Sequence, residues 1–269
     1  MPGDAFEALM GLWREIPSHA GMKVLDASCG KGLTTQALME AGFDVTATNY
    51  SRERHPRMPP DVRFVGGVDL NGRLPFEDGS FDGVNLREVF EHLENPAHTV
   101  REFARVLRPG GVWVLATPNI LNCLSRTRLL VAGFFQGLNR PVSYAKPTGD
   151  ADNLYVTNLP QLHYLLAQSG MSIEAMRLGH YEWRSLLLAV ALYPAIWLGT
   201  TAALWRVHRK DVLMKDDRLK AAEEVIQDLR ARQKLVHGRL RRLLLSKEVL
   251  LGRSLILRAR KTGASPFDA

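Results

Sequence analysis

The chain has 269 residues, of which 46% are hydrophobic, and a net charge of +7. This length suits one α/β domain with an added element, and two cysteines exclude a disulfide framework and favour a reducing compartment. Residues 206–261 hold 17 basic and 7 acidic side chains, so the positive excess belongs to that region and not to the rest of the chain.

The first part of the chain alternates strand and helix signals. Residues 1–17 lack a basic region followed by an apolar run, which predicts an amphipathic helix and not a signal peptide. Helical spacing is found over 32–42 and over 88–107, where it is interrupted near Pro96. Residues 108–111 predict a turn. Strands are expected at 22–28, 43–49, 62–67, 81–86 and 112–118. This alternation implies a doubly wound parallel sheet that binds its ligand beyond the carboxyl ends of the strands.

The second part adds two helices and two strands. A helix is expected around 121–135, and residues 141–153 form a loop rich in helix breakers. Thr157 or Asn158 caps a further helix over 159–170. Strands are expected at 171–178 and 252–261, with an unusual insertion between them.

The stretch "VLDASCGKGLTTQAL" places an acid and two glycines between a strand and a helix. Gly30 and Gly32 let the backbone approach a ligand closely, and the helix start supplies free N–H groups. Asp26 would repel a pyrophosphate but would suit an amino group or a ribose hydroxyl. The alternative interpretation is an ordinary tight turn.

The downstream motifs "DLNGRLPFEDGSFDGVNLREVFEHLENP" and "LRPGGVWVLATPN" give this turn a context. With them, the chain resembles class I S-adenosylmethionine-dependent methyltransferases, in the methyltransferase type 11 branch that includes the ubiquinone-biosynthesis O-methyltransferases. The resemblance covers residues 24–179 and the last strand. It implies a Rossmann-like α/β fold with a seven-stranded sheet, mostly parallel with an antiparallel last strand. Residues 1–182 would form the cofactor-binding core, 183–249 a helical insertion, and 250–269 the last core strand and tail.

The resemblance also implies which residues hold S-adenosylmethionine. Asp26 corresponds to the acid near the methionine amino group, and Asp69, beside Leu70, to the contact with the adenine amino group. Arg87 would lie beside the sulfonium through its backbone. The remaining implied contacts come from two turns and are Ser28, Cys29, Gly30, Gly32, Asn49 and Tyr50.

Two positions depart from the family pattern. Ser28 replaces the usual first glycine of the turn, and Asn49 stands where the family has an acid that binds both ribose hydroxyls. An amide oxygen accepts a hydrogen bond without the strength that a charge adds. We therefore expect cofactor binding to be about tenfold weaker, or about 1.4 kcal/mol.

The segment "EVFEHLENP" carries Glu88, Glu91 and His92, which a helix would place on one face near the methyl group of the cofactor. His92, with Glu91, is the candidate general base for a substrate hydroxyl. The same three residues match the pattern with which ubiquinone-type enzymes hold a divalent cation such as Mg²⁺. A purely structural role near the helix start is the third interpretation.

Residues 185–205 form an uncharged apolar run of the length of a membrane span. A single crossing would separate the last strand from its sheet, and Pro194 interrupts the run. We therefore expect a helical hairpin that enters one leaflet and leaves on the same side. A buried lid or a homodimer contact is the alternative.

Residues 211–247 predict a basic amphipathic helix. Its charge favours an anionic lipid surface, and the absence of aromatic residues disfavours nucleic acid, whose bases stack on aromatic rings. The sequence thus predicts a methyltransferase that is peripheral or monotopic at the cytoplasmic face of a membrane. Its acceptor would be a small-molecule or lipid-linked phenol, quinol or glycan that is methylated on oxygen. A non-catalytic scaffold with a degenerate pocket is the alternative function.

Overall fold

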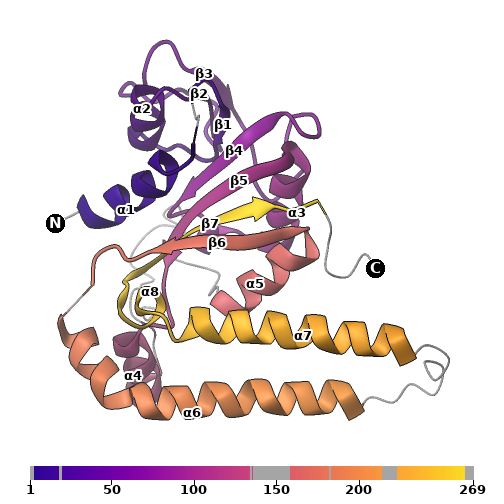
Figure 1. The fold of residues 1–269 in the computed structure, drawn as a ribbon. Coiled ribbons are helices and arrows are strands. Elements are labelled where there is room, and N and C mark those ends of the chain that lie inside the picture. The colour runs from indigo at the N-terminus through magenta and orange to yellow at the C-terminus, as the bar shows by residue number, and fades with distance from the viewer. Residues whose placement is uncertain are drawn as a thin grey trace.

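The structure is a computed structural model that describes residues 3–17, 20–133, 135, 158–181, 183–213 and 223–263. Its centre is a seven-stranded sheet in the order β3-β2-β1-β4-β5-β7-β6 (Figure 1). The strands are β1 (Lys23–Asp26), β2 (Asp44–Asn49), β3 (Arg63–Gly66), β4 (Phe81–Arg87), β5 (Leu107–Pro118), β6 (Met171–Arg177) and β7 (Ser254–Lys261).

The sheet confirms the predicted fold class. The first five strands are parallel, and β7 runs antiparallel to both β5 and β6. The predicted turn at 108–111 is instead part of β5. The pairing with β4 is irregular there: its register shifts between the pairs Phe81↔Leu107 and Gly83↔Val112, and residues 108–111 lie between these two pairs.

Helices cover the two faces of the sheet, and each face has its own hydrophobic core. The helices of the core are α1 (Gly3–Arg14), α2 (Leu33–Glu40), α3 (Pro96–Val106), α4 (Cys123–Ala132) and α5 (Leu159–Gln168). Side chains of α1 and α2, such as Trp13 and Leu38, pack on one face. Side chains of α3 and α5, such as Phe103 and Leu162, pack on the other. Alternate residues of a strand serve opposite faces, as Val24 does for the first core and Leu25 for the second.

The predicted helix over 88–107 is wrong in its first half. A short 3-10 helix, η1 (Phe90–His92), is followed by an extended Leu93, and α3 begins only at Pro96. Proline favours the first turn of a helix because its missing N–H would have no partner there. The Asn95 side chain accepts a hydrogen bond from the His98 N–H and caps α3.

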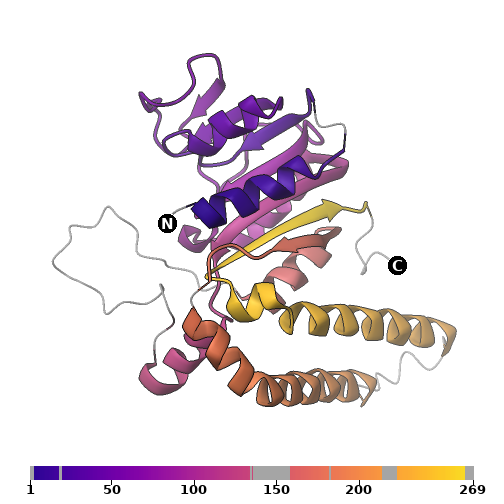
Figure 2. The same ribbon diagram turned by 60° about the vertical axis from the view of Figure 1, so that its left-hand side comes forward.

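The insertion is not the predicted pair of short helical arms. A single helix, α6 (Trp183–Leu213), contains Pro194 without ending there. The basic helix is also shorter than 211–247: residues 211–213 belong to α6, α7 spans Glu223–Leu244, and α8 (Lys247–Leu251) leads into β7. Figures 1 and 2 both show α6 and α7 side by side as two long helices that extend past the sheet. The predicted loop at 141–153 lies outside the described residues.

Candidate functional site

The structure brings the ends of three parallel strands to one edge. Asp26 ends β1, Asn49 ends β2 and Arg87 ends β4. Asp26 pairs in register with Ala47 on one side and with Asn85 on the other, so Asn49 and Arg87 each lie two residues beyond it. The candidate cofactor residues on these strands therefore share the edge at which parallel α/β sheets bind ligands.

The bend between β1 and α2 has an open, left-handed backbone. Ser28, Gly30 and Gly32 have φ angles of 56°, 57° and 82°. A side chain at Gly30 would meet no described heavy atom within 4 Å, whereas a Cβ at Gly32 would lie 2.7 Å from Cγ of Met58. Gly32 is thus required by packing, while Gly30 leaves free space above the bend. Ser28 adopts a conformation that costs a residue with a side chain about 1–3 kcal/mol.

Asp26 is buried at the end of β1, with 2% of its surface exposed. One carboxylate oxygen accepts a hydrogen bond of 2.6 Å from the Thr35 hydroxyl, and the other accepts one of 2.7 Å from the Asn85 amide. The Trp13 indole in turn donates to the Asn85 carbonyl oxygen at 3.0 Å. Burial raises the pKa of Asp26, and the hydrogen bonds from Thr35 and Asn85 act in the opposite direction. These hydrogen bonds connect α1, β4 and α2 to the Asp26 carboxylate. That this carboxylate binds a methionine amino group stays a prediction.

Asn49 and Tyr50 lie at the turn after β2. The Asn49 side-chain oxygen accepts a hydrogen bond of 2.9 Å from the Tyr50 N–H, and the Tyr50 side chain is exposed. The Asn49 backbone carbonyl accepts a hydrogen bond of 3.0 Å from the Val68 N–H. This last bond places the segment that carries Asp69 beside the end of β2, as the family resemblance implies.

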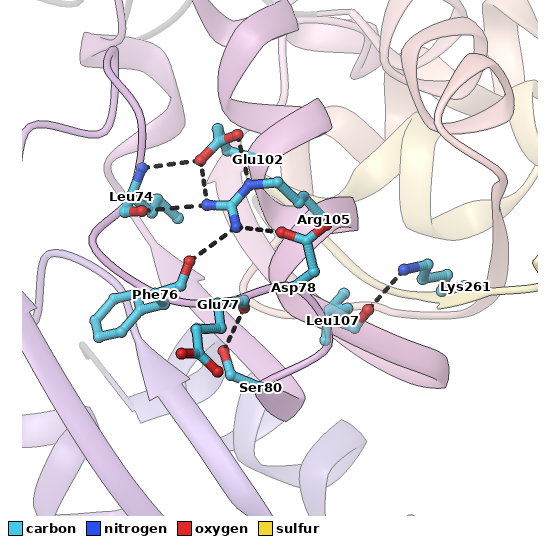
Figure 3. A network of polar contacts seen from close by, with 9 residues as sticks. All are labelled: Leu74, Phe76, Glu77, Asp78, Ser80, Glu102, Arg105, Leu107 and Lys261. Atoms are coloured by element: carbon cyan, nitrogen blue, oxygen red, sulfur yellow. Dashed lines mark hydrogen bonds and ion pairs between the residues drawn. The ribbon is translucent and has the colours of Figure 1, made fainter.

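The Asp69 segment is held against α3 by side chains. Asp69 is exposed and accepts hydrogen bonds from the backbone and side chain of Asn71 at 2.9 and 3.1 Å, whereas Leu70 is buried in the core. The Asn71 oxygen accepts two backbone N–H groups at the loop before α3, and the Thr99 hydroxyl donates to the Leu70 carbonyl at 2.8 Å. Two nitrogens of the Arg105 guanidinium in α3 donate to the carbonyls of Phe76 and Leu74 in the following loop, while Nε donates to Glu102 of the same helix (Figure 3).

Arg87 and Glu88 mark the end of β4. The Arg87 guanidinium lies 5.5 Å from the ring centroid of Phe6 in α1. Glu88 has a φ angle of 53°, which is uncommon for a residue with a side chain and concentrates at functional sites. Burial of its carboxyl raises the pKa of Glu88 to about 7, and the charge of Glu91 raises it further in the same direction. As a residue, Glu88 is nevertheless exposed to solvent.

Glu91 and His92 are neighbours in η1 that differ in burial. Glu91 is buried and accepts a hydrogen bond of 3.0 Å from the Thr117 hydroxyl of β5, and burial raises its pKa. His92 is about one-third exposed, with Nε2 3.9 Å from a Glu91 oxygen. Its buried Nδ1 has no hydrogen-bond partner among the described residues.

The prediction that Glu88, Glu91 and His92 hold a divalent cation is wrong on this geometry. No three His, Cys, Asp or Glu side chains in the described part of the chain come together as a metal site. The prediction required one helix face, but Glu88 precedes η1 in a left-handed conformation. Glu91 meanwhile turns into the core toward Thr117.

Sequence reasoning missed the residues that support Asp26 and Glu91. Asn85 carried a signal, since it is a polar side chain inside an otherwise apolar buried strand. No sequence signal marked three other supporting residues, because each comes from a segment whose local pattern predicts only packing: Trp13, Thr35 and Thr117. The same is true of Met58, which packs against Gly32 in the bend.

Comparisons with known proteins match the part of the chain that carries the candidate site. Residues 25–115 match the family model described as a methyltransferase domain. The chain is 35% identical over 112 residues to a demethylmenaquinone methyltransferase of Paenarthrobacter aurescens, which covers 39% of this chain and 44% of that protein. It is 34% identical over 109 residues to a ubiquinone biosynthesis O-methyltransferase of Xanthomonas oryzae pv. oryzae, covering 37% and 44%. Residues 25–115 are thus similar to a methyltransferase domain, and the chain spans less than half the length of these curated relatives.

Solved structures share the fold over nearly the whole chain. An S-adenosylmethionine-dependent methyltransferase from Mesorhizobium loti has a TM-score of 0.51 and 17% identity, covering 96% of this chain and 98% of that one. The [4+2]-cyclase SpnF has the same TM-score with 16% identity, covering 95% and 81%. Since one of these neighbours bears the name of a cyclase, the fold alone does not assign the reaction.

Proposed function

We propose that the protein binds S-adenosylmethionine at the edge formed by β1, β2 and β4 and transfers its methyl group to an acceptor oxygen. The observation that carries the proposal is the open left-handed bend at Gly30, which lies at the same strand edge as Glu88. The exposed carboxylate of Asp69 and the buried one of Asp26 suit a ligand with a positive sulfur and an amino group. These carboxylates fit S-adenosylmethionine better than a phosphate, which they would repel.

The residues would divide the work as follows. The bend from Ser28 to Gly32 would lie against the methionine and ribose, Asn49 would accept a ribose hydroxyl, and Asp69 would bind the adenine amino group. S-adenosylmethionine supplies an electrophilic methyl group. His92 would take the proton of the acceptor hydroxyl, and the neighbouring Glu91 would stabilise the charged imidazole. The protein's remaining task is to hold the acceptor oxygen in line with the sulfur.

The acceptor would be an amphipathic or lipid-linked phenol or quinol that is reached at a membrane surface on the cytoplasmic side. Two relatives support a quinone-related acceptor by their names, demethylmenaquinone methyltransferase and ubiquinone biosynthesis O-methyltransferase. Exposed apolar side chains of α4, which follows the end of β5 directly, support an acceptor with an apolar tail. The unpartnered Nδ1 of His92 supports an acceptor that loses a proton on methylation, as a hydroxyl does, because a general base is needed where a proton must leave.

The test combines cofactor binding with methyl transfer. Calorimetry with S-adenosylmethionine should show binding, and tritiated-methyl transfer to a prenylated catechol in detergent micelles should show turnover. The His92→Gln variant should lose turnover by about 10²–10⁴-fold without a change in cofactor affinity, while the matched variant His163→Gln, in α5, should retain both. A folded protein that binds no cofactor at millimolar concentration is instead a scaffold, and unchanged turnover in His92→Gln removes the histidine from the mechanism.

A further inference from the structure

Over residues 185–205, helix α6 is uncharged and apolar on all sides, yet most of these side chains are not buried. The span Trp183–Arg206 is long and apolar enough to cross a membrane by length and composition, with a mean hydropathy of 1.7, and only 6% of its most apolar 18-residue stretch is buried. One narrow stripe, which includes Ala189 and Ile196, packs on Cys123 and Leu250. Large hydrophobic side chains are exposed elsewhere on this helix: Trp183, Leu186, Leu187, Val190, Tyr193, Trp197, Leu198 and Trp205. A helix that is apolar on all sides requires an apolar surrounding.

Helix α4 extends this surface. It packs against α6, and its last turn exposes Leu129, Leu130 and Val131. We call the exposed apolar side chains of α4 and α6 the apolar platform. In both ribbon views, α4 and the start of α6 lie together at the end of the molecule toward which β4 and β5 point (Figures 1 and 2). The platform therefore begins near the strand edge that carries the candidate site.

The topology prevents α6 from crossing a bilayer. It starts after β6, and α7 returns through α8 to β7, which pairs with β6 in the same sheet. Because α7 packs along α6, a crossing α6 would carry α7 into the hydrocarbon. Nine of the 22 residues of α7 are charged, and each would be strongly disfavoured there. If this pair of helices meets a membrane, α6 would therefore lie along the surface and not across it.

The chemistry at the margins of the platform identifies the partner. Trp and Tyr favour the boundary between lipid tails and water, and four such residues lie on α6. Arg184 and Arg206 flank its apolar stretch, and Lys234, Arg239 and Arg242 are exposed on the adjacent α7. Basic side chains beside an apolar face complement anionic headgroups, whereas a contact between two copies of this chain would bring like charges together.

We propose that the apolar platform lies flat in one leaflet of an anionic membrane, with α6 parallel to the bilayer plane. This goes beyond the proposed function, since the orientation would hold for any acceptor. Native tryptophans provide the probe. Trp183, Trp197 and Trp205 are exposed on α6, while Trp13 and Trp113 are fully buried. Vesicles of phosphatidylglycerol and phosphatidylcholine should shift the emission to shorter wavelength, and phosphatidylcholine alone should do so less.

Depth-dependent quenching distinguishes a flat helix from a crossing one. Trp183 and Trp205 are 22 residues apart, or about 33 Å along a helix. In variants that retain one α6 tryptophan each, lipids brominated at different depths should quench all three from the same shallow position. Strongest quenching of Trp197 from the bilayer centre, with the other two near the surfaces, would overturn the flat orientation.

Substitutions test the platform itself. Val190→Glu should weaken vesicle binding roughly tenfold or more, and Val190→Glu with Leu198→Glu roughly hundredfold or more. The matched control Tyr164→Glu changes an exposed aromatic residue of α5 and should leave binding within twofold. Cofactor binding by calorimetry should stay unchanged in all of these variants, so a failure here is distinct from a failure of the proposed function. Vesicle binding that survives both platform substitutions overturns the proposal. The proposal is also overturned if the parent protein does not bind vesicles and forms a dimer in lipid-free solution that the Val190→Glu substitution dissociates.

Discussion

Arg105 joins α3 to the loop that follows the Asp69 segment, and its removal should destabilise the protein. Its guanidinium donates to both oxygens of Glu102 at 2.7 and 2.9 Å, to the carbonyls of Leu74 and Phe76 at 3.1 and 2.8 Å, and to Asp78 at 2.8 Å (Figure 3). The Arg105→Met variant keeps the apolar stem of the side chain and removes these five contacts.

The magnitude follows from the burial of each partner. Asp78 is 76% exposed, so its ion pair contributes less than about 1 kcal/mol. The Glu102 side chain is only 10% exposed, and the loss of the partner of a buried charge costs about 3–5 kcal/mol. Glu102 keeps one hydrogen bond, of 2.8 Å from the Leu74 N–H, which reduces this cost. We expect a loss of about 3 kcal/mol in the free energy of unfolding, or about 6–12 °C in Tm.

Urea unfolding at pH 7 measures this loss, and Arg108→Met is the matched control. Arg108 is 56% exposed and, among the described residues, forms an ion pair with Asp82, so its removal should lower the free energy of unfolding by less than about 1 kcal/mol. If Arg105→Met lowers the free energy of unfolding no more than Arg108→Met does, the hydrogen bonds of Arg105 do not stabilise the loop against α3.

The pH dependence of the free energy of unfolding gives a second test of the Arg105–Glu102 contact. The hydrogen bond from Arg105 lowers the pKa of Glu102, so its contribution is present above the unfolded pKa of about 4.3 and is lost as pH falls through the folded value. The difference between the Arg105→Met variant and the parent protein should therefore shrink below about pH 4. A difference that stays constant across this range would show that Glu102 is not its source.

Three further predictions concern the candidate site. Ser28→Gly should relieve the left-handed strain and raise stability by about 1 kcal/mol, a rise of about 2–4 °C in Tm, after the extra backbone entropy of glycine is subtracted; an unchanged or lower Tm would contradict this. Asn49→Asp should tighten S-adenosylmethionine binding by about tenfold in calorimetry, and unchanged affinity would remove position 49 from the ribose contact. Burial, followed by the Asp26 charge, raises the pKa of Cys29 to about 12, so an aromatic disulfide reagent should label the half-buried Cys29 far more slowly in the folded protein than after unfolding. Labelling of the folded protein at the rate of a free thiol would contradict this.

The order of strands could be predicted because each strand carries its own signal. Short apolar runs between glycine, proline and asparagine define β1, β2, β4 and β5 within a few residues. The family motifs then predict which strand ends carry polar residues. Both kinds of information are local, and the structure places the resulting residues at one edge, as parallel pairing requires.

The errors arose where distant contacts override a local pattern. The helical spacing over 88–107 was correct for α3, but Glu91 gains a hydrogen bond from Thr117, 26 residues later, only if the chain turns at η1. The support of Asp26 by Trp13 and Asn85 spans 72 and 59 residues of sequence between partners. Pro194 suggested two arms, yet one missing N–H does not end a helix of 31 residues whose one side packs on α4 and α7.

The corrected shape of the insertion bears on how an acceptor would reach the proposed site. A hairpin that dips into the bilayer would anchor the protein at one point and leave the site free to rotate. A platform that lies flat would fix the tilt of the protein relative to the membrane plane, because α4 and the start of α6 form an extended surface and not a single point of contact. Since that surface begins at the end of the molecule where β4 and β5 terminate, the strand edge would be held beside the headgroups. An acceptor anchored in the same leaflet would then reach the candidate site by lateral diffusion, with its apolar tail still in lipid, so the protein would need to bind only the head of the molecule.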